Sequence, residues 1–141
     1  VTAANKVEGG IFVSLHFNYG SSSASGIETF ALSPYGAEST ISGPARSDYR
    51  SFQGNQRDSE NIALATAVHV SVIKKVGGID RGIKRARWAV LRGINKPAIL
   101  FEGGFLTNKE EARKIADANH REALASAMAD AIVNFRDAIS Q

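Results

Sequence analysis

PAILFE, residues 97–102, is an apolar run that ends in a single carboxylate, and Gly103-Gly104 follows it directly. A short apolar run bounded by turn residues is typical of a strand that is buried on both faces. We therefore predict a buried strand here, stopped by the glycine pair. A second run, IFVSLHF at residues 11–17, is apolar at nearly every position and predicts another strand that is covered on both faces.

Strand and helix patterns alternate along the rest of the chain. Further strands are expected at residues 26–32 and 84–91, the latter approached through a turn at residues 80–82. Helices are expected from Asp58 or Ser59 to about Val76, from a capping box formed by Thr107 and Glu110, and from a second box formed by Asn119 and Glu122. The pattern predicts an α/β fold: one three-layer αβα domain over residues 1–141 with a central, largely parallel mixed sheet.

Composition narrows the classes of protein that remain. The 141 residues suit one domain, and 43% hydrophobic with 22% charged residues excludes a disordered tail or a disulfide scaffold. Cysteine is absent, which excludes disulfides, cysteine nucleophiles and thiolate metal sites. No apolar run is long enough to predict a membrane span.

The net charge of +3 is unevenly distributed. The segment at residues 74–92 has seven basic residues against Asp80 alone, so it carries +6 and the remainder −3. Such a segment could attract nucleic acid or another polyanion, or it could be a solvated helix end and strand edge. The second interpretation is favoured because the basic residues are not interleaved with the aromatic residues that single-strand binders use. No nucleic-acid partner is therefore predicted.

A long polar loop is expected at residues 33–58. We predict that it lies at the rim of the strand C-termini, on the same side as the candidate site, where it would meet sugars and peptide carboxylates. The residues suited to that contact are Arg46, Arg50, Arg57, Tyr49 and Phe52. The alternative is a plain surface insertion that Tyr49 and Phe52 pin to the core.

Polar residues at the C-terminal ends of strands are the first candidates for chemistry in an α/β sheet. His16 closes the run at residues 11–17, and Glu102 closes the run at residues 97–102. A carboxylate at the end of so apolar a strand is costly to keep ionised without a partner. Each also has a structural interpretation, in which His16 is hydrogen-bonded under a loop and Glu102 pairs with an arginine. His69 and His120 are expected to be structural.

Four motifs in order carry a resemblance to a known family. SLHFN at residues 14–18, followed by GIETF at residues 26–30, resembles the S-[IL]-H-x-N and S-x-G-x-E-x-[FY] motifs of zinc-dependent N-acetylmuramoyl-L-alanine amidases. Later stretches are similar to that family's signatures at residues 80–84, 88–92 and 97–108. The resemblance extends from about residue 4 to the final helix.

The resemblance implies a function and a set of site residues. It implies hydrolysis of the amide between N-acetylmuramic acid and L-alanine of peptidoglycan, with Zn²⁺ as cofactor and a periplasmic or extracellular location. His16 would be a zinc ligand, Glu102 the catalytic carboxylate, and Asn18 a substrate-binding residue. The chemistry is consistent with this, since zinc lowers the pKa of bound water and a neighbouring carboxylate takes the water's proton.

One departure from the family pattern concerns the metal. By the resemblance, two further zinc ligands, a histidine and a glutamate, precede the S-[IL]-H-x-N motif, yet the fifteen residues before His16 contain no histidine and only Glu8 as an acid. We therefore expect the later part of a catalytic domain, without its opening strands and helix and with an incomplete zinc site. The alternatives are a metal-free, non-catalytic fragment or cell-wall-binding module of the same fold and, more distantly, a polyanion binder.

Overall fold

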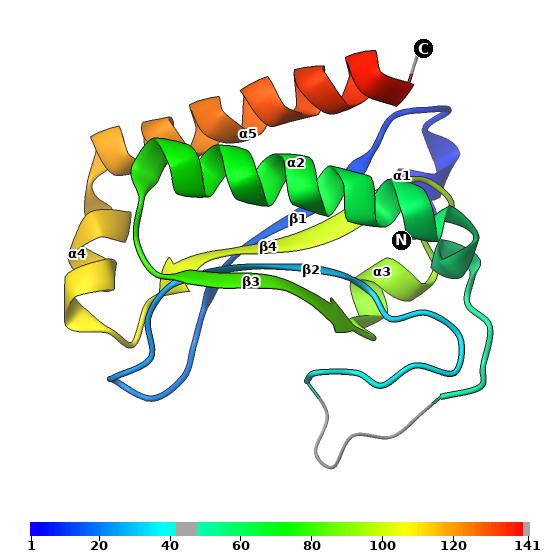
Figure 1. Ribbon diagram of the computed structural model, residues 1–141, viewed down its shortest axis with the longest axis horizontal. Coiled ribbons are helices and arrows are strands. Elements are labelled where there is room, and N and C mark those ends of the chain that lie inside the picture. The colour runs from blue at the N-terminus through cyan, green and yellow to red at the C-terminus, as the bar shows by residue number, and fades with distance from the viewer. Residues whose placement is uncertain (42–47, 140–141) are drawn as a thin grey trace.

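The computed structural model describes residues 1–41 and 48–139 as a sheet covered by helices (Figure 1). The helices are α1 (Thr2–Lys6), α2 (Asp58–Val76), α3 (Ala89–Arg92), α4 (Lys109–Ala116) and α5 (Ala118–Ile139), with a 3₁₀ helix at Gln53–Arg57. The strands are β1 (Phe12–Asn18), β2 (Ile27–Leu32), β3 (Asp80–Ala86) and β4 (Ala98–Phe105). Among these described residues, no helix is long and apolar enough to cross a membrane.

The strands form one mixed sheet in the order β1-β4-β2-β3. β1 is parallel to β4 and β2 is parallel to β3, so the two halves of the sheet are each parallel. They meet at an antiparallel join between β2 and β4. The C-terminal end of β4 therefore lies beside the N-terminal end of β2.

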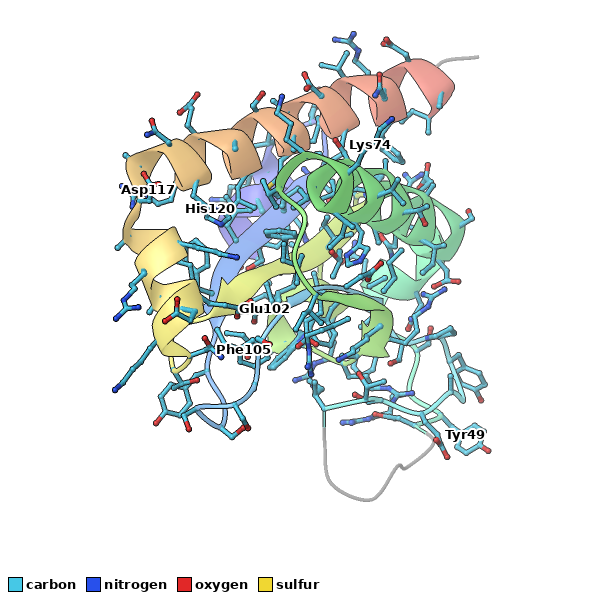
Figure 2. The ribbon with its side chains drawn as sticks, turned by 60° about the vertical axis from the view of Figure 1, so that its left-hand side comes forward. Tyr49, Lys74, Glu102, Phe105, Asp117 and His120 are labelled. Carbon is cyan, nitrogen blue, oxygen red and sulfur yellow. The ribbon has the colours of Figure 1, made fainter. Side chains whose placement is uncertain are left out.

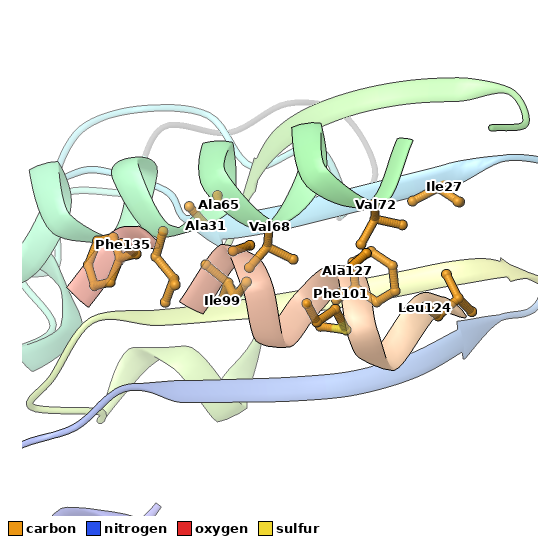
Figure 3. Close-up of a cluster of buried hydrophobic side chains, with 13 residues drawn as sticks. Ile27, Ala31, Ala65, Val68, Val72, Ile99, Phe101, Leu124, Ala127 and Phe135 are labelled. Carbon is orange, nitrogen blue, oxygen red and sulfur yellow. The ribbon is translucent and has the colours of Figure 1, made fainter. Parts of the chain in front are cut away.

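The sheet is the middle of three layers, as the sequence predicts. On one face, α2 and α5 pack side by side and their apolar residues meet those of β2 and β4, including Val68, Phe101 and Leu124 (Figure 3). On the other face, Leu91 and Ile94 at and beyond α3 pack against Phe30 and neighbouring strand residues. Because both faces of the sheet are covered, β2 and β4 are buried along their whole length.

Two strands differ from the sequence prediction. β1 is not covered on both faces: it has no fully buried residue, and Leu15 is 65% exposed. β3 begins at Asp80 and ends at Ala86, whereas a strand at residues 84–91 was expected. Pairing with β2 starts the strand early, and the edge-on contact of Trp88 with the Phe30 ring accompanies the turn into α3.

The helix bounds are close to the predicted ones, but the capping residues are not. Asp58 is the first residue of α2 rather than its cap, and its carboxylate forms an ion pair with Arg85. At α4 the side chain of Asn108 accepts the N–H groups of Glu110 and Glu111, so the predicted box of Thr107 with Glu110 is wrong. The residue that caps α4 is therefore Asn108, one position later than predicted. Glu111, in the first turn of α4, takes no part in the predicted box.

The predicted place of the long loop is also wrong. β2 runs antiparallel to β4, so the loop that follows Leu32 leaves the sheet at the end opposite to Glu102. Figure 2 shows Tyr49 and Glu102 well apart. Phe52 packs against the apolar cluster on the α3 face, as the surface-insertion alternative expects, and Arg46 lies outside the described residues.

Candidate active site

His16 and Glu102 are brought together by the parallel pairing of β1 with β4. Their Cα atoms are direct partners in the register of the two strands. The His16 side chain is exposed, and its Nε2 lies 2.9 Å from the hydroxyl of Ser14. An imidazole and a carboxyl group thus share one end of the sheet.

Glu102 is a buried carboxyl group that pairs with no cation in the part of the chain that the structure describes. The residue is 7% exposed, and its Oε2 has no hydrogen-bond partner among the described residues. Burial raises the pKa of Glu102, and the nearby negative charge of Glu28 raises it further, to about 7. The interpretation that an arginine pairs with Glu102 is therefore wrong within the described part of the chain.

The cations instead surround Glu28, the strand partner of Glu102 across the β2–β4 join. Glu28 accepts hydrogen bonds from Nε of Arg81 at 2.8 Å and from Nζ of Lys84. Burial raises the pKa of Glu28, but the hydrogen bonds and charges of Lys84 and Arg81 together outweigh it and hold that pKa below its ordinary value. The sequence signal for Glu28 is a charged residue inside the apolar run at residues 26–32, and it does not lie at the C-terminal end of that run.

Asn18 is the third side chain that donates a hydrogen bond to Glu28. Its Nδ2 donates to Oε1 of Glu28 at 2.7 Å, and its Oδ1 accepts the N–H of Tyr19 at 2.9 Å. Both ends of the amide are thus engaged within the protein. Contact of Asn18 with substrate stays a prediction, which an Asn18→Ala variant with a raised KM would support.

The basic segment is partly internal rather than a free surface. Arg81 and Lys84 bind Glu28, Arg85 pairs with Asp58, and Arg87 donates to the carbonyl oxygen of Ala37. These four side chains bind groups within the fold. The geometry therefore favours the interpretation of this segment as a helix end and strand edge over its interpretation as a surface that binds polyanions.

His69 has the structural role that the sequence predicts. Its Nδ1 lies 3.0 Å from the hydroxyl of Thr29, and its Nε2 lies 2.8 Å from a carboxylate oxygen of Asp80. The order of hydroxyl, imidazole and carboxylate resembles a catalytic triad. However, Thr29 is fully buried beneath α2 and no substrate could reach it. The contacts link α2 to β2 and β3.

The described residues do not complete a catalytic metal centre. In residues 1–41 and 48–139, no group of three or more His, Asp or Glu side chains could hold a metal ion. A catalytic zinc site takes three protein ligands and a water. His16 is exposed and suited to be one such ligand, but the residues present do not by themselves fit the ion.

Comparison with known proteins gives one consistent result. A family model for N-acetylmuramoyl-L-alanine amidase matches residues 1–134. The chain is 31% identical over 150 residues to the N-acetylmuramoyl-L-alanine amidase AmiC of Escherichia coli O6:H1, which covers 91% of this chain and 36% of that protein. It spans between 23% and 56% of the length of the first curated relatives that it matches.

Solved structures give the same family. The catalytic domain of CwlV, an N-acetylmuramoyl-L-alanine amidase from Bacillus (Paenibacillus) polymyxa var. colistinus, is similar with a TM-score of 0.75 and 28% identity. That similarity covers 97% of this chain and 63% of the other. The N-acetylmuramoyl-L-alanine amidase from Clostridium difficile 630 has a TM-score of 0.73 and 29% identity, covering 96% and 62%.

Proposed function

Because the chain belongs to the N-acetylmuramoyl-L-alanine amidase family, we propose that it hydrolyses the amide between N-acetylmuramic acid and L-alanine in peptidoglycan. The observation that supports this within the molecule is Glu102, a buried carboxyl group near the end of β4 with one oxygen that no described residue binds. Peptidoglycan lies outside the cytoplasmic membrane. We therefore also propose that the protein acts in the cell envelope, in the periplasm or outside the cell.

Glu102 suits the part of general base and general acid. A pKa of about 7 leaves a useful fraction of the carboxylate able to accept a proton at neutral pH and a useful fraction able to give it back. In the proposed reaction, water gives a proton to Glu102 while its oxygen bonds to the amide carbon. The carbon–nitrogen bond then breaks, and Glu102 returns the proton to the departing amine.

A dependence on Zn²⁺ is a separate proposal, with His16 as one ligand. The described side chains do not supply a group of three donors. Zinc binding by His16 would therefore need further ligands beyond those that the described residues supply. The 141-residue chain, dialysed against a weak chelator, is then expected to retain no stoichiometric zinc. One tightly held zinc per chain in elemental analysis would contradict this ligand assignment.

The incomplete donor set also favours a second candidate, a metal-free module of the same fold that binds the cell wall without cutting it. Sedimentation of the chain with purified peptidoglycan measures binding. The appearance of new L-alanine amino groups measures cleavage. Binding without cleavage by the protein as its gene encodes it, with zinc supplied, would support the module and reject the amidase.

Glu102→Gln tests the proposed chemistry. The amide is nearly isosteric but cannot accept the water's proton. In the protein as its gene encodes it, with zinc supplied, we therefore expect the rate of amide cleavage to fall by about 10²- to 10⁴-fold with substrate binding retained. Glu110→Gln is the matched control, because Glu110 is an exposed carboxylate on α4 that pairs only with Arg113 in the described contacts. A Glu102→Gln protein that cleaves at the wild-type rate would show that Glu102 is not the base.

A further inference from the structure

The antiparallel pairing of β2 with β4 is short and ends at the candidate site. It consists of three pairs, and the pair of Glu28 with Glu102 is the last one at the site end. Continuing the same register would bring Ile27 opposite Gly103 and then Gly26 opposite Gly104. The φ angles of Gly26 and Gly104 are +112° and +125°, which regular strand residues do not adopt. The two carboxyl groups therefore occupy the last rung before the ladder stops.

A ladder that stops leaves backbone N–H groups that need other partners. At this end one side chain supplies them on both strands. Oε1 of Glu111 accepts the N–H of Gly26 at 2.7 Å, and Oε2 accepts the N–H of Phe105 at 2.6 Å. The carboxylate thus bridges the start of β2 and the end of β4 where the ladder has no further rung.

Glu111 is itself held in place. It is in the first turn of α4, and its own N–H donates to the capping side chain of Asn108 at 3.2 Å. Its carboxylate lies against Gly104, where a Cβ atom would come within 3.4 Å of Oε2. Asn108, Glu111 and Gly104 therefore form one fixed unit at the site end of the sheet.

We propose that Glu111 is a positioning residue that clips the ends of β2 and β4 together and so sets how Glu28 and Glu102 face each other. Among the described hydrogen bonds, none joins Glu111 to either of those carboxyl groups, so it acts through the backbone. The consequence for catalysis rests on the proposed amidase function. The effect on the geometry of the two glutamates does not.

Nuclear magnetic resonance on the chain tests the proposal without an activity assay. In Glu111→Ala we expect amide hydrogen exchange at Gly26 and Phe105 to accelerate by about tenfold or more, because each amide loses a charged acceptor. We also expect the side-chain carboxyl ¹³C resonances of Glu28 and Glu102 to shift. Glu111→Gln keeps one carbonyl oxygen and should rescue one of the two amides, with smaller shifts. This variant also carries the test if the alanine variant does not fold.

Glu110→Ala is the control on the same helix, and it should leave all four signals unchanged. Two results would overturn the proposal. In one, Gly26 and Phe105 are released while the resonances of Glu28 and Glu102 stay in place. In the other, exchange accelerates equally throughout the core, which marks a loss of overall stability only.

An activity measurement then separates this inference from the proposed function. If the protein is an amidase, Glu111→Ala should lower kcat at an unchanged KM, because substrate binding is kept while the base is displaced. An unchanged kcat would overturn the inference. A wild-type protein without amidase activity would reject the proposed function and leave the resonance test of Glu111 standing.

Discussion

Two buried glutamates face each other across one pair of strands, and they differ in the charges and hydrogen-bond donors that surround them. Glu28 on β2 is bound by Lys84, Arg81 and the amide of Asn18. Glu102 on β4 has an oxygen without a partner among the described residues, and no cation pairs with it there. Burial is common to both, so it does not explain the difference between them.

The difference teaches how one site keeps two carboxyl groups in different protonation states. Countercharges stabilise the ionised form of Glu28 and lower its pKa, whereas burial beside that fixed negative charge raises the pKa of Glu102. Pairs whose pKa values are pushed apart in this way are typical of acid–base catalysis. Glu28 is thus part of the environment that raises the pKa of Glu102 to about 7.

The largest effect is expected from removing the countercharge. Lys84→Met should lower the free energy of unfolding by about 3 kcal/mol at pH 7, because it leaves Glu28 buried with fewer partners. The pKa of Glu28 is depressed in the fold, so the stability it contributes is present above the unfolded value of 4.5 and is lost as pH falls. The cost of the substitution should therefore shrink in acid.

Urea unfolding at several pH values measures this. Lys75→Met is the control, because Lys75 is an exposed lysine at the end of α2. Equal stability of the Lys84→Met and wild-type proteins at pH 7 would mean that Lys84 does not compensate Glu28.

The next effect has the opposite sign with pH. The pKa of Glu102 is raised from 4.5 to about 7 in the fold, so the folded state holds this proton more tightly than the unfolded state. The contribution of Glu102 to wild-type stability should then fall by about 2 to 3 kcal/mol as pH rises between these values. In Glu102→Gln this pH-dependent loss should disappear.

Thermal or urea unfolding at pH 4 and pH 8 measures how the free energy of unfolding changes with pH in the wild type and in Glu102→Gln. Glu122→Gln, an exposed carboxylate on α5, should keep the wild-type slope. If Glu102→Gln also keeps it, then Glu102 ionises at an ordinary pKa and the contrast with Glu28 is wrong.

A smaller effect is expected at Asn18. Asn18→Ala removes one of the hydrogen bonds to Glu28 and should cost about 1 kcal/mol of stability. The pKa of Glu28, followed by its carboxyl ¹³C resonance, should rise because a donor to the charged form is lost. If the pKa of Glu28 does not change in this variant, then Lys84 and Arg81 alone stabilise its ionised form.

The smallest effect is expected at the other end of the sheet. Tyr49 is 68% exposed and makes one edge-on ring contact with Tyr35. Tyr49→Ala should change stability by no more than about 0.5 kcal/mol and leave the pKa of Glu102 where it is. A shift of that pKa in this variant would show that the loop reaches the site after all.

Several features could be predicted from local pattern alone. The apolar runs identify β2 and β4 closely, and α2 runs from Asp58 to Val76 as expected. Glycines and prolines act on their own neighbours, so strand ends such as the one at Glu102 are visible in the sequence. For the same reason, His16 and Glu102 could be chosen as polar residues that close apolar strands.

What the sequence does not specify is strand direction and which charges meet. The sequence predicts the long loop beside the site because the loop follows a strand, but the antiparallel join puts it at the far end of the sheet. The cations that bind Glu28 lie 53 and 56 residues away in the chain, and no local rule selects Lys84 and Arg81 for Glu28 rather than for Glu102.

The sequence by itself determined the fold class, the family and the two residues that close the apolar strands, because each of these depends on residue type and short spacing. Only the tertiary structure decided that Glu28 is compensated, that no described cation compensates Glu102, and that Glu111 joins the two strands at their ends. The physical reason is that the pKa of a buried carboxyl group depends on the charges and donors within a few ångströms of it. Those neighbours come from strands and helices that pairing across the sheet brings together, whatever their distance along the chain.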